Sequence, residues 1–294
     1  MLQSHRLTGI SCLLLICWHL LVSSSSAQTL TRLEPTTFDS MEYRHIGPVG
    51  NRVSAVVGVP GDRNIYYAGA ASGGIFKSID GGIHWEPIFD DQPVASIGAL
   101  AINPVNPNIV WAGTGETFIR SNISHGNGIY RSTDAGKTWQ HMGLDATGRI
   151  GRIVVHPTNP DIVFAAALGH GYGPQEDRGI FRSQDNGLTW EHVLFVDEHT
   201  GASDLAIDPN NPQILFAGMW QLFIQTWGRE SGGPGSGLWT SRDGGSTWHE
   251  LTGNGLPSKP LGKIGLSMTP IDSNRIYALI ETNADANVED HEGV

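Results

Sequence analysis

The sequence predicts an all-β fold, a β-propeller built from four-stranded antiparallel blades. Three observations lead to this prediction: a twelve-residue segment occurs four times, a pair of apolar strands around a proline occurs five times, and glycine makes up 38 of the 294 residues. Repetition at a period of roughly 50 residues indicates an array of equal structural units. Glycine and proline supply the backbone angles of tight turns, so their abundance favours many short strands over helices.

The twelve-residue segment first occurs at 74–85 as GIFKSIDGGIHW and recurs at 128–139, 179–190 and 237–248. Serine, aspartate and glycine keep the same spacing in every copy, and tryptophan ends each one. In such a turn the aspartate accepts hydrogen bonds from backbone N–H groups, glycine adopts a positive φ, and tryptophan packs between sheets. We therefore expect a structural role and no active site here. The residues concerned are Asp80, Trp85, Asp134, Trp139, Asp185, Trp190, Asp243 and Trp248.

A pair of apolar strands around a proline turn precedes each copy and occurs once more after the last. The prolines of these turns are Pro60, Pro104, Pro157, Pro209 and Pro270. The strands are rich in β-branched and aromatic residues, as is typical of strands that are buried on both faces. One unit thus consists of strand, proline turn, strand, variable loop, strand, aspartate turn and strand. Four antiparallel strands in roughly 50 residues form one propeller blade.

The aspartate turn resembles the Asp-box (BNR) repeat of β-propellers, whose signature is Ser-x-Asp-x-Gly-x-Thr-Trp. Three copies match it fully, and the first has His84 where threonine is expected. The layout of residues 43–282 is most similar to bacterial sortilin-like repeat proteins, which are often labelled glycosyl hydrolases. The resemblance implies that the Asp-boxes lie on the rim opposite the ligand-binding face.

The repeat count predicts an incomplete ring. The sequence contains five strand pairs but only four boxes, because the unit that begins at Leu261 has no hairpin before Val294. A propeller must close to protect its edge strands, so we expect a truncated propeller of about five blades, with further blades of the same chain after Val294. The alternative is a five-bladed ring closed by an N-terminal strand around Tyr43–Ile46. The expected domains are a signal peptide at 1–27, a linker at 28–42, blades at 43–282 and a truncated segment at 283–294.

The N-terminus has the pattern of a secretory signal peptide. A short basic start is followed by an apolar stretch at 10–22 and by small residues that end at Ala27. This stretch is too short to span a membrane, so we expect export to the periplasm, outer surface or exterior, with no membrane insertion after cleavage. Both cysteines, Cys12 and Cys17, lie in this segment, so the mature chain forms no disulfide.

Composition argues against several partners. The formal net charge is -11, which disfavours a nucleic-acid ligand because phosphate binding needs a basic face. His156, His170 and His199 show no metal-ligand spacing, and no cofactor or metal is expected.

The loops opposite the boxes are the expected working face. Three of them, at 115–127, 169–178 and 220–236, join the second and third strands of a blade, and Asp197–His199 leads into a blade on the same side. Aromatic, arginine and carboxylate side chains on one face suit a peptide or sugar ligand, although any single one could be an ordinary solvated loop residue. The candidates for ligand binding are Glu116, Arg120, His125, His170, Tyr172, Glu176, Arg178, Glu198, His199, Trp220, Trp227 and Arg229.

Two inner-strand positions predict an ion pair. Counting back five positions from the proline of the repeat gives Arg152 and Asp204 on neighbouring blades, where the other units carry alanine or glycine. We expect the pair near the central channel, in a structural role.

Two functions from different classes remain. The first is a binding module for peptide or glycan ligands, and the second is a glycoside hydrolase with loop carboxylates as acid and base. Xyloglucanases, in which similar Asp-boxes occur, carry a catalytic aspartate just before a glycine pair, where this chain has Ala71-Ser72-Gly73-Gly74. A sialidase would need three arginines around a carboxylate, and only Arg152 and Arg178 are candidates. The sequence therefore favours binding over catalysis and assigns no catalytic residue.

Overall fold

The computed structural model describes residues 36, 52–120 and 122–282. By its contacts the chain divides into Met1–His45 and a compact unit Ile46–Val294. The expected signal peptide, closing strand around Tyr43 and segment 283–294 lie outside the described residues. No helix in the described ranges is long and apolar enough to cross a membrane.

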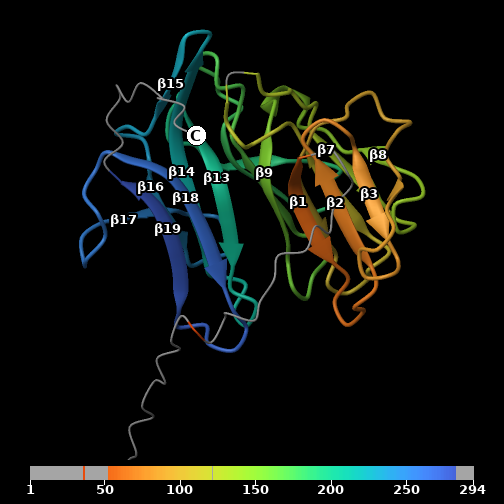
Figure 1. Ribbon diagram of the computed structural model, residues 1–294. Helices are drawn as coiled ribbons and strands as arrows, with labels where there is room; N and C mark the ends of the chain where they lie inside the picture. The colour runs from red at the N-terminus through yellow and green to blue at the C-terminus, as the bar shows by residue number, and fades with distance from the viewer. Residues whose placement is uncertain (1–35, 37–51, 121, 283–294) are drawn as a thin grey trace, which may run out of the picture. The chain divides into compact units, whose positions relative to one another are not determined.

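Five antiparallel sheets make up the compact unit (Figure 1). The first sheet contains β1 (Val53–Gly58), β2 (Tyr66–Ala70), β3 (Ile75–Ser78) and β4 (Glu86–Pro87). The second contains β5 (Ile97–Ile102), β6 (Val110–Thr114), β7 (Ile129–Ser132) and β8 (Gln140–His141). The third contains β9 (Ile150–Val155), β10 (Val163–Ala167), β11 (Gly179–Ser183) and β12 (Glu191–Leu194). The fourth contains β13 (Thr200–Ile207), β14 (Leu215–Gln225), β15 (Gly228–Ser231), β16 (Gly237–Ser241) and β17 (His249–Leu251), and the fifth β18 (Leu261–Met268) and β19 (Ile276–Thr282).

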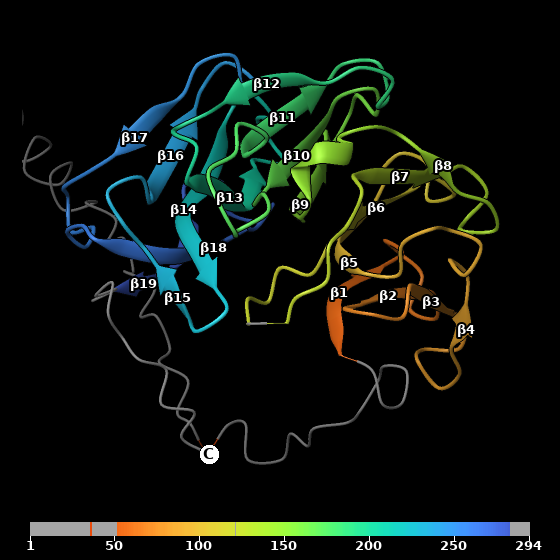
Figure 2. The ribbon, with the colours of Figure 1, turned by 90° about the horizontal axis from the view of Figure 1, so that it is seen from above.

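The innermost strands of consecutive sheets pack on one another, β1 on β5, β5 on β9, β9 on β13 and β13 on β18. Seen from above, the sheets follow one another along an arc, with β1 near one end and β19 near the other (Figure 2). Each main apolar cluster lies between two neighbouring sheets; one, for example, joins Trp111 of β6 to Ile150 of β9. The predicted all-β propeller of four-stranded blades is confirmed.

Glycine in the second strand lets neighbouring sheets approach closely. A Cβ on Gly113 of β6 would lie 2.5 Å from the side chain of Ile150 in the next sheet, and one on Gly218 of β14 would lie 2.9 Å from Ile264. Both distances are shorter than real carbon contacts. The isoleucines therefore fill the space that the missing side chains leave.

The Asp-boxes form the expected hydrogen-bonded turns. In the second box Ser132 Oγ donates to Asp134 Oδ1 at 2.8 Å, and Thr138 Oγ1 donates to Asp134 Oδ2 at 2.7 Å. In the first box His84 Nδ1 contacts Asp80 Oδ2 at 2.6 Å, so histidine replaces the threonine. The boxes connect the third and fourth strands, and the loops between second and third strands therefore leave the sheets at the opposite end.

The four box tryptophans are half-buried, and they bond in two ways. Trp139 Nε1 donates to Ile88 O and Trp190 Nε1 to Met142 O, each directly after the last strand of the preceding sheet. Trp85 and Trp248 instead donate to glycine carbonyls of their own boxes. Two of the four thus bridge sheets through a hydrogen bond.

One segment expected to be a loop contains strands. Residues 220–236 begin with the extension of β14 to Gln225, which turns at Thr226–Trp227 and returns as β15. The hairpin projects at the top of Figure 1. Trp220, Leu222 and Ile224 are buried and the residues between them are only partly buried, which is the period-two pattern of a half-buried strand and explains this difference.

Candidate functional site

An apolar cluster holds the loops of three consecutive blades together on the face opposite the boxes, called the loop face below. Ile123 comes from the loop at 115–127, Leu168 directly follows β10, and Trp220, Leu222 and Ile224 come from β14. Ile119 packs against this cluster from the same loop as Ile123. Burial of this apolar area fixes the loops relative to the sheets.

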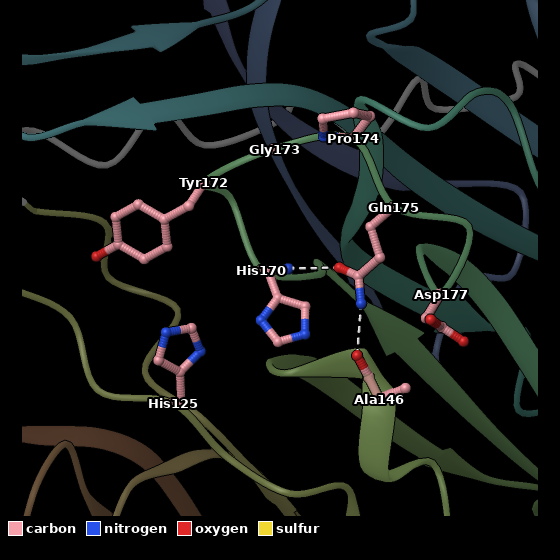
Figure 3. Close-up of a pocket in the computed structure, with 8 residues that line it drawn as sticks. All are labelled: His125, Ala146, His170, Tyr172, Gly173, Pro174, Gln175 and Asp177. Carbon is pink, nitrogen blue, oxygen red and sulfur yellow. Dashed lines mark hydrogen bonds between the residues drawn. The ribbon is translucent and has the colours of Figure 1, made fainter.

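A pocket of about 560 Å³ opens on the loop face between the second and third sheets. Its lining, drawn in Figure 3, consists of His125, Ala146, His170, Tyr172, Gly173, Pro174, Gln175 and Asp177. The ring centroids of His125 and His170 are 5.2 Å apart, and those of His125 and Tyr172 are 5.8 Å apart. Gln175 connects two parts of the pocket lining, because its side-chain amide accepts a hydrogen bond from His170 N at 2.7 Å and donates one to Ala146 O.

Arg149 lies beneath this pocket, and no motif of the sequence marks it as a site residue. Its side chain is fully buried, and Nη1 donates to the carbonyls of Gly169 and His170. The ring of Tyr172 lies 5.7 Å from the guanidinium carbon. Burial lowers the pKa of Arg149 to about 10. Burial, followed by the charges of Arg149 and His170, also lowers the pKa of His125.

Two charged candidates are inaccessible because they hold the loops in place. Glu116 is buried and forms ion pairs with Arg52 at 3.2 Å and Arg120 at 3.1 Å. Arg178 is buried and donates to the carbonyls of Gly173, His199 and Leu222, and burial lowers its pKa to about 10. Neither side chain can reach a ligand on the surface without leaving these partners.

The remaining candidates separate by exposure. Trp220 is buried and donates to Ser231 Oγ at 3.0 Å, whereas Trp227 at the hairpin tip is 84% exposed. Arg229 donates to Ile119 O at 2.9 Å and so links the hairpin to the loop at 115–127. Glu176 and Glu198 are exposed, and His199 lines a second pocket of about 340 Å³. Within the described residues, no group of three metal-ligating side chains forms a metal site.

The predicted ion pair is confirmed. Arg152 Nε lies 3.5 Å from Asp204 Oδ1, and Asp204 Oδ2 accepts a bond from Leu266 N at 2.8 Å. The aspartate therefore connects the inner strands of the third, fourth and fifth sheets.

The sequence matches the Sortilin-Vps10 family, described as sortilin, neurotensin receptor 3, over residues 127–286, which is more than half of the chain. The chain belongs to the Sortilin-Vps10 family. The expected resemblance to sortilin-like Asp-box propellers is thereby confirmed.

Curated relatives of this Sortilin-Vps10 chain include xyloglucanases. One from Paenibacillus sp is 27% identical over 74% of the chain, and one from Acetivibrio thermocellus is 25% identical over 78%. These matches span 22% and 28% of the relatives' own lengths.

Solved structures agree on the fold. An ancestral GH74 enzyme superposes with a TM-score of 0.61 at 21% identity, covering 81% of this chain and 30% of that one. The GH74 enzyme of Niastella koreensis gives a TM-score of 0.55 at 18% identity, covering 78% and 35%.

Proposed function

We propose that this Sortilin-Vps10 chain is an exported glycan-binding module whose ligand lies on the loop face. The observation that carries the proposal is a set of exposed aromatic rings on that face: Tyr172 beside the pocket, Phe118 in the loop at 115–127 and Trp227 at the hairpin tip are 42%, 55% and 84% exposed. Aromatic faces carry negative charge density and attract the C–H groups of a sugar ring. Exposed rings on one face of a rigid scaffold are typical of a binding surface.

The similarity to xyloglucanases favours a glycan over a peptide as the ligand. A second candidate function, glycoside hydrolysis, also draws support from that similarity. It needs two carboxylates beside the scissile bond. Glu116 already forms ion pairs with two arginines, and Asp177 is the one carboxylate that lines the described pocket at His125. Ala71, in the segment where xyloglucanases carry a catalytic aspartate, is a buried apolar residue. Binding is therefore preferred for the described residues.

The test is the affinity of the purified chain for a polysaccharide panel that includes xyloglucan, measured by calorimetry. We expect Trp227→Ala or Tyr172→Ala to weaken binding about tenfold, which corresponds to about 1.4 kcal/mol. Tyr277→Ala is the matched control, because Tyr277 is an exposed aromatic residue on β19, beside the proline turn and away from the loop face. The Tyr277→Ala variant should bind the polysaccharide with the same affinity as the parent chain.

The outcomes separate the functions. Binding of peptides but of no glycan would refute the glycan proposal, and release of new reducing ends from a polysaccharide would establish the hydrolase instead. Export is checked separately, by expressing the whole chain and identifying the N-terminus of the protein recovered outside the cytoplasm, which we expect to be Gln28.

A further inference from the structure

The pocket on the loop face brings two imidazoles close to a buried guanidinium, although the chain as a whole is acidic. The chain carries a formal net charge of -11, yet this pocket is lined by the imidazoles of His125 and His170 and lies over the buried guanidinium of Arg149. Asp177 also belongs to the lining, and Figure 3 shows it on the far side of Gln175 from the two histidines. The charged groups that act on the His125 imidazole are therefore those of Arg149 and His170.

Arg149 has donors without acceptors. Its Nη1 bonds to two backbone carbonyls, but the buried atoms Nε and Nη2 have no hydrogen-bond partner among the described residues. The carboxylate of Glu116 raises the pKa of Arg149 through its charge, but it forms its ion pairs with Arg52 and Arg120. Leaving charged donors unpaired in the interior is costly, so an arrangement of this kind favours the arrival of an anion nearby.

The wall above Arg149 suits a sugar. The ring of Tyr172 covers the guanidinium at 5.7 Å and is partly exposed to solvent on the pocket side. The backbone of Gly148 supports the His170 ring, since a Cβ at Gly148 would lie 3.1 Å from Nδ1. The pocket thus combines an aromatic ring with two imidazoles in fixed positions.

We propose that this pocket binds the carboxylate of a hexuronic acid residue in an acidic glycan. In this arrangement His125 and His170 donate hydrogen bonds to the carboxylate, Tyr172 contacts the sugar ring, and Arg149 supplies positive charge from below. The inference rests on the proposed glycan-binding function and names the class of sugar.

Protonation gives the site a pH dependence. The groups that face His125 are His170, Tyr172 and Arg149, with Asp177 farther along the wall. In the free protein, burial and then the interactions with Arg149 and His170 lower the pKa of His125 and so disfavour its charged form. A bound carboxylate favours it, so binding takes up a proton and tightens as the pH falls from about 7 to about 5, where a uronate is still ionised.

The experiment compares uronic acid trimers with their methyl esters, which keep the sugar but lose the charge. The probes are trigalacturonate, triglucuronate and the two corresponding trimethyl esters, titrated into the whole chain at pH 7 and pH 5. We expect at least one acid trimer to bind about tenfold more tightly than its ester, with a larger ratio at pH 5. His125→Gln and His170→Gln should reduce the ratio to less than about threefold while ester binding persists.

Folding of each variant is checked by its melting temperature. Arg149→Met is included, but the histidine variants carry the test if it does not fold. Arg242→Gln is the charge-matched control, because Arg242 is exposed in the fourth Asp-box.

The results distinguish this inference from the function on which it rests. Equal affinity for both acids and their esters, or an undiminished ratio in the two histidine variants, would overturn the uronate site and leave neutral glycan binding intact. Failure of every glycan in the panel would overturn both proposals. Preference for a peptide with a free C-terminal carboxylate over both uronates would also overturn the inference.

Discussion

The carboxylates of the Asp-boxes are stabilised in their ionised form by several short hydrogen bonds each. Bonds from Thr138 and Thr189, first from the hydroxyl and then from the backbone, lower the pKa of Asp134 and Asp185 to about 2. The hydroxyl and then the backbone of Thr247 lower the pKa of Asp243 in the same way, whereas the pKa of Asp80 is lowered first by the backbone N–H of His84 and then by its imidazole. Their unfolded-state value is about 3.9. Folding is therefore favoured above that pH, and the contribution is lost as pH falls toward the folded-state values.

Acid should unfold this protein in a defined window. We expect the melting temperature to be level from about pH 7 to about pH 5 and to fall steeply from about pH 4 to about pH 2, because four carboxylates titrate there. Asp134→Asn should be less stable at pH 7 and should lose less on acidification, since one titrating group is removed. A parallel decline of variant and parent with pH would show that this box contributes nothing to the acid transition.

Cationic side chains of the third strands fasten each sheet to the next Asp-box. Lys77 Nζ donates to Ala135 O at 2.9 Å, and Arg131 Nη1 donates to Asn186 O at 2.6 Å. Arg182 Nη1 repeats the bond to Gly244 O at 2.8 Å. Each box also donates a backbone bond to its own proline turn, for example Ala135 N to Asn108 O at 2.8 Å, so the boxes tie structural elements together.

Breaking one such contact should destabilise the fold. Arg131 also lies over the Trp111 ring, with its guanidinium carbon at 5.7 Å, so Arg131→Met removes a charge-assisted hydrogen bond and a cation–π contact. We expect a loss of about 1–2 kcal/mol in the free energy of unfolding, measured by urea denaturation. Lys137→Met is the control, because Lys137 is exposed at the tip of the second box. An equal loss in both variants would refute the assigned contact.

At the scale of the elements, local patterns predicted most of what the structure contains. Strand pairs and Asp-boxes are determined by residues close in sequence, such as Ser132 and Asp134, so their geometry could be predicted. Arg149 is different, because the same place before the inner strand holds Ser96 and His199 in neighbouring units. Only the packing of two sheets makes that arginine buried and places it under a pocket.

At the scale of the whole molecule, burial decides which loop residues can act. Glu116, Arg178 and Trp220 were predicted from their chemical type, and the structure uses all three to anchor loops. His125, His170 and Tyr172 come from two loops that meet only because consecutive sheets pack side by side. A single sequence reveals which side chains suit a ligand, but it does not reveal which of them are buried in tertiary contacts and so cannot reach one.

Consecutive sheets share apolar clusters with their neighbours, so stability should vary along the arc rather than be uniform. Every residue of β6 and β10 is buried, whereas most of β19 is exposed. In hydrogen exchange measured by mass spectrometry, the amides of β6 and β10 should exchange most slowly and those of β19 fastest. Arg131→Met should accelerate exchange in the second and third sheets before the fourth. Equal protection of β19 and β6, or a uniform acceleration in the variant, would instead show that the unit opens only as a whole.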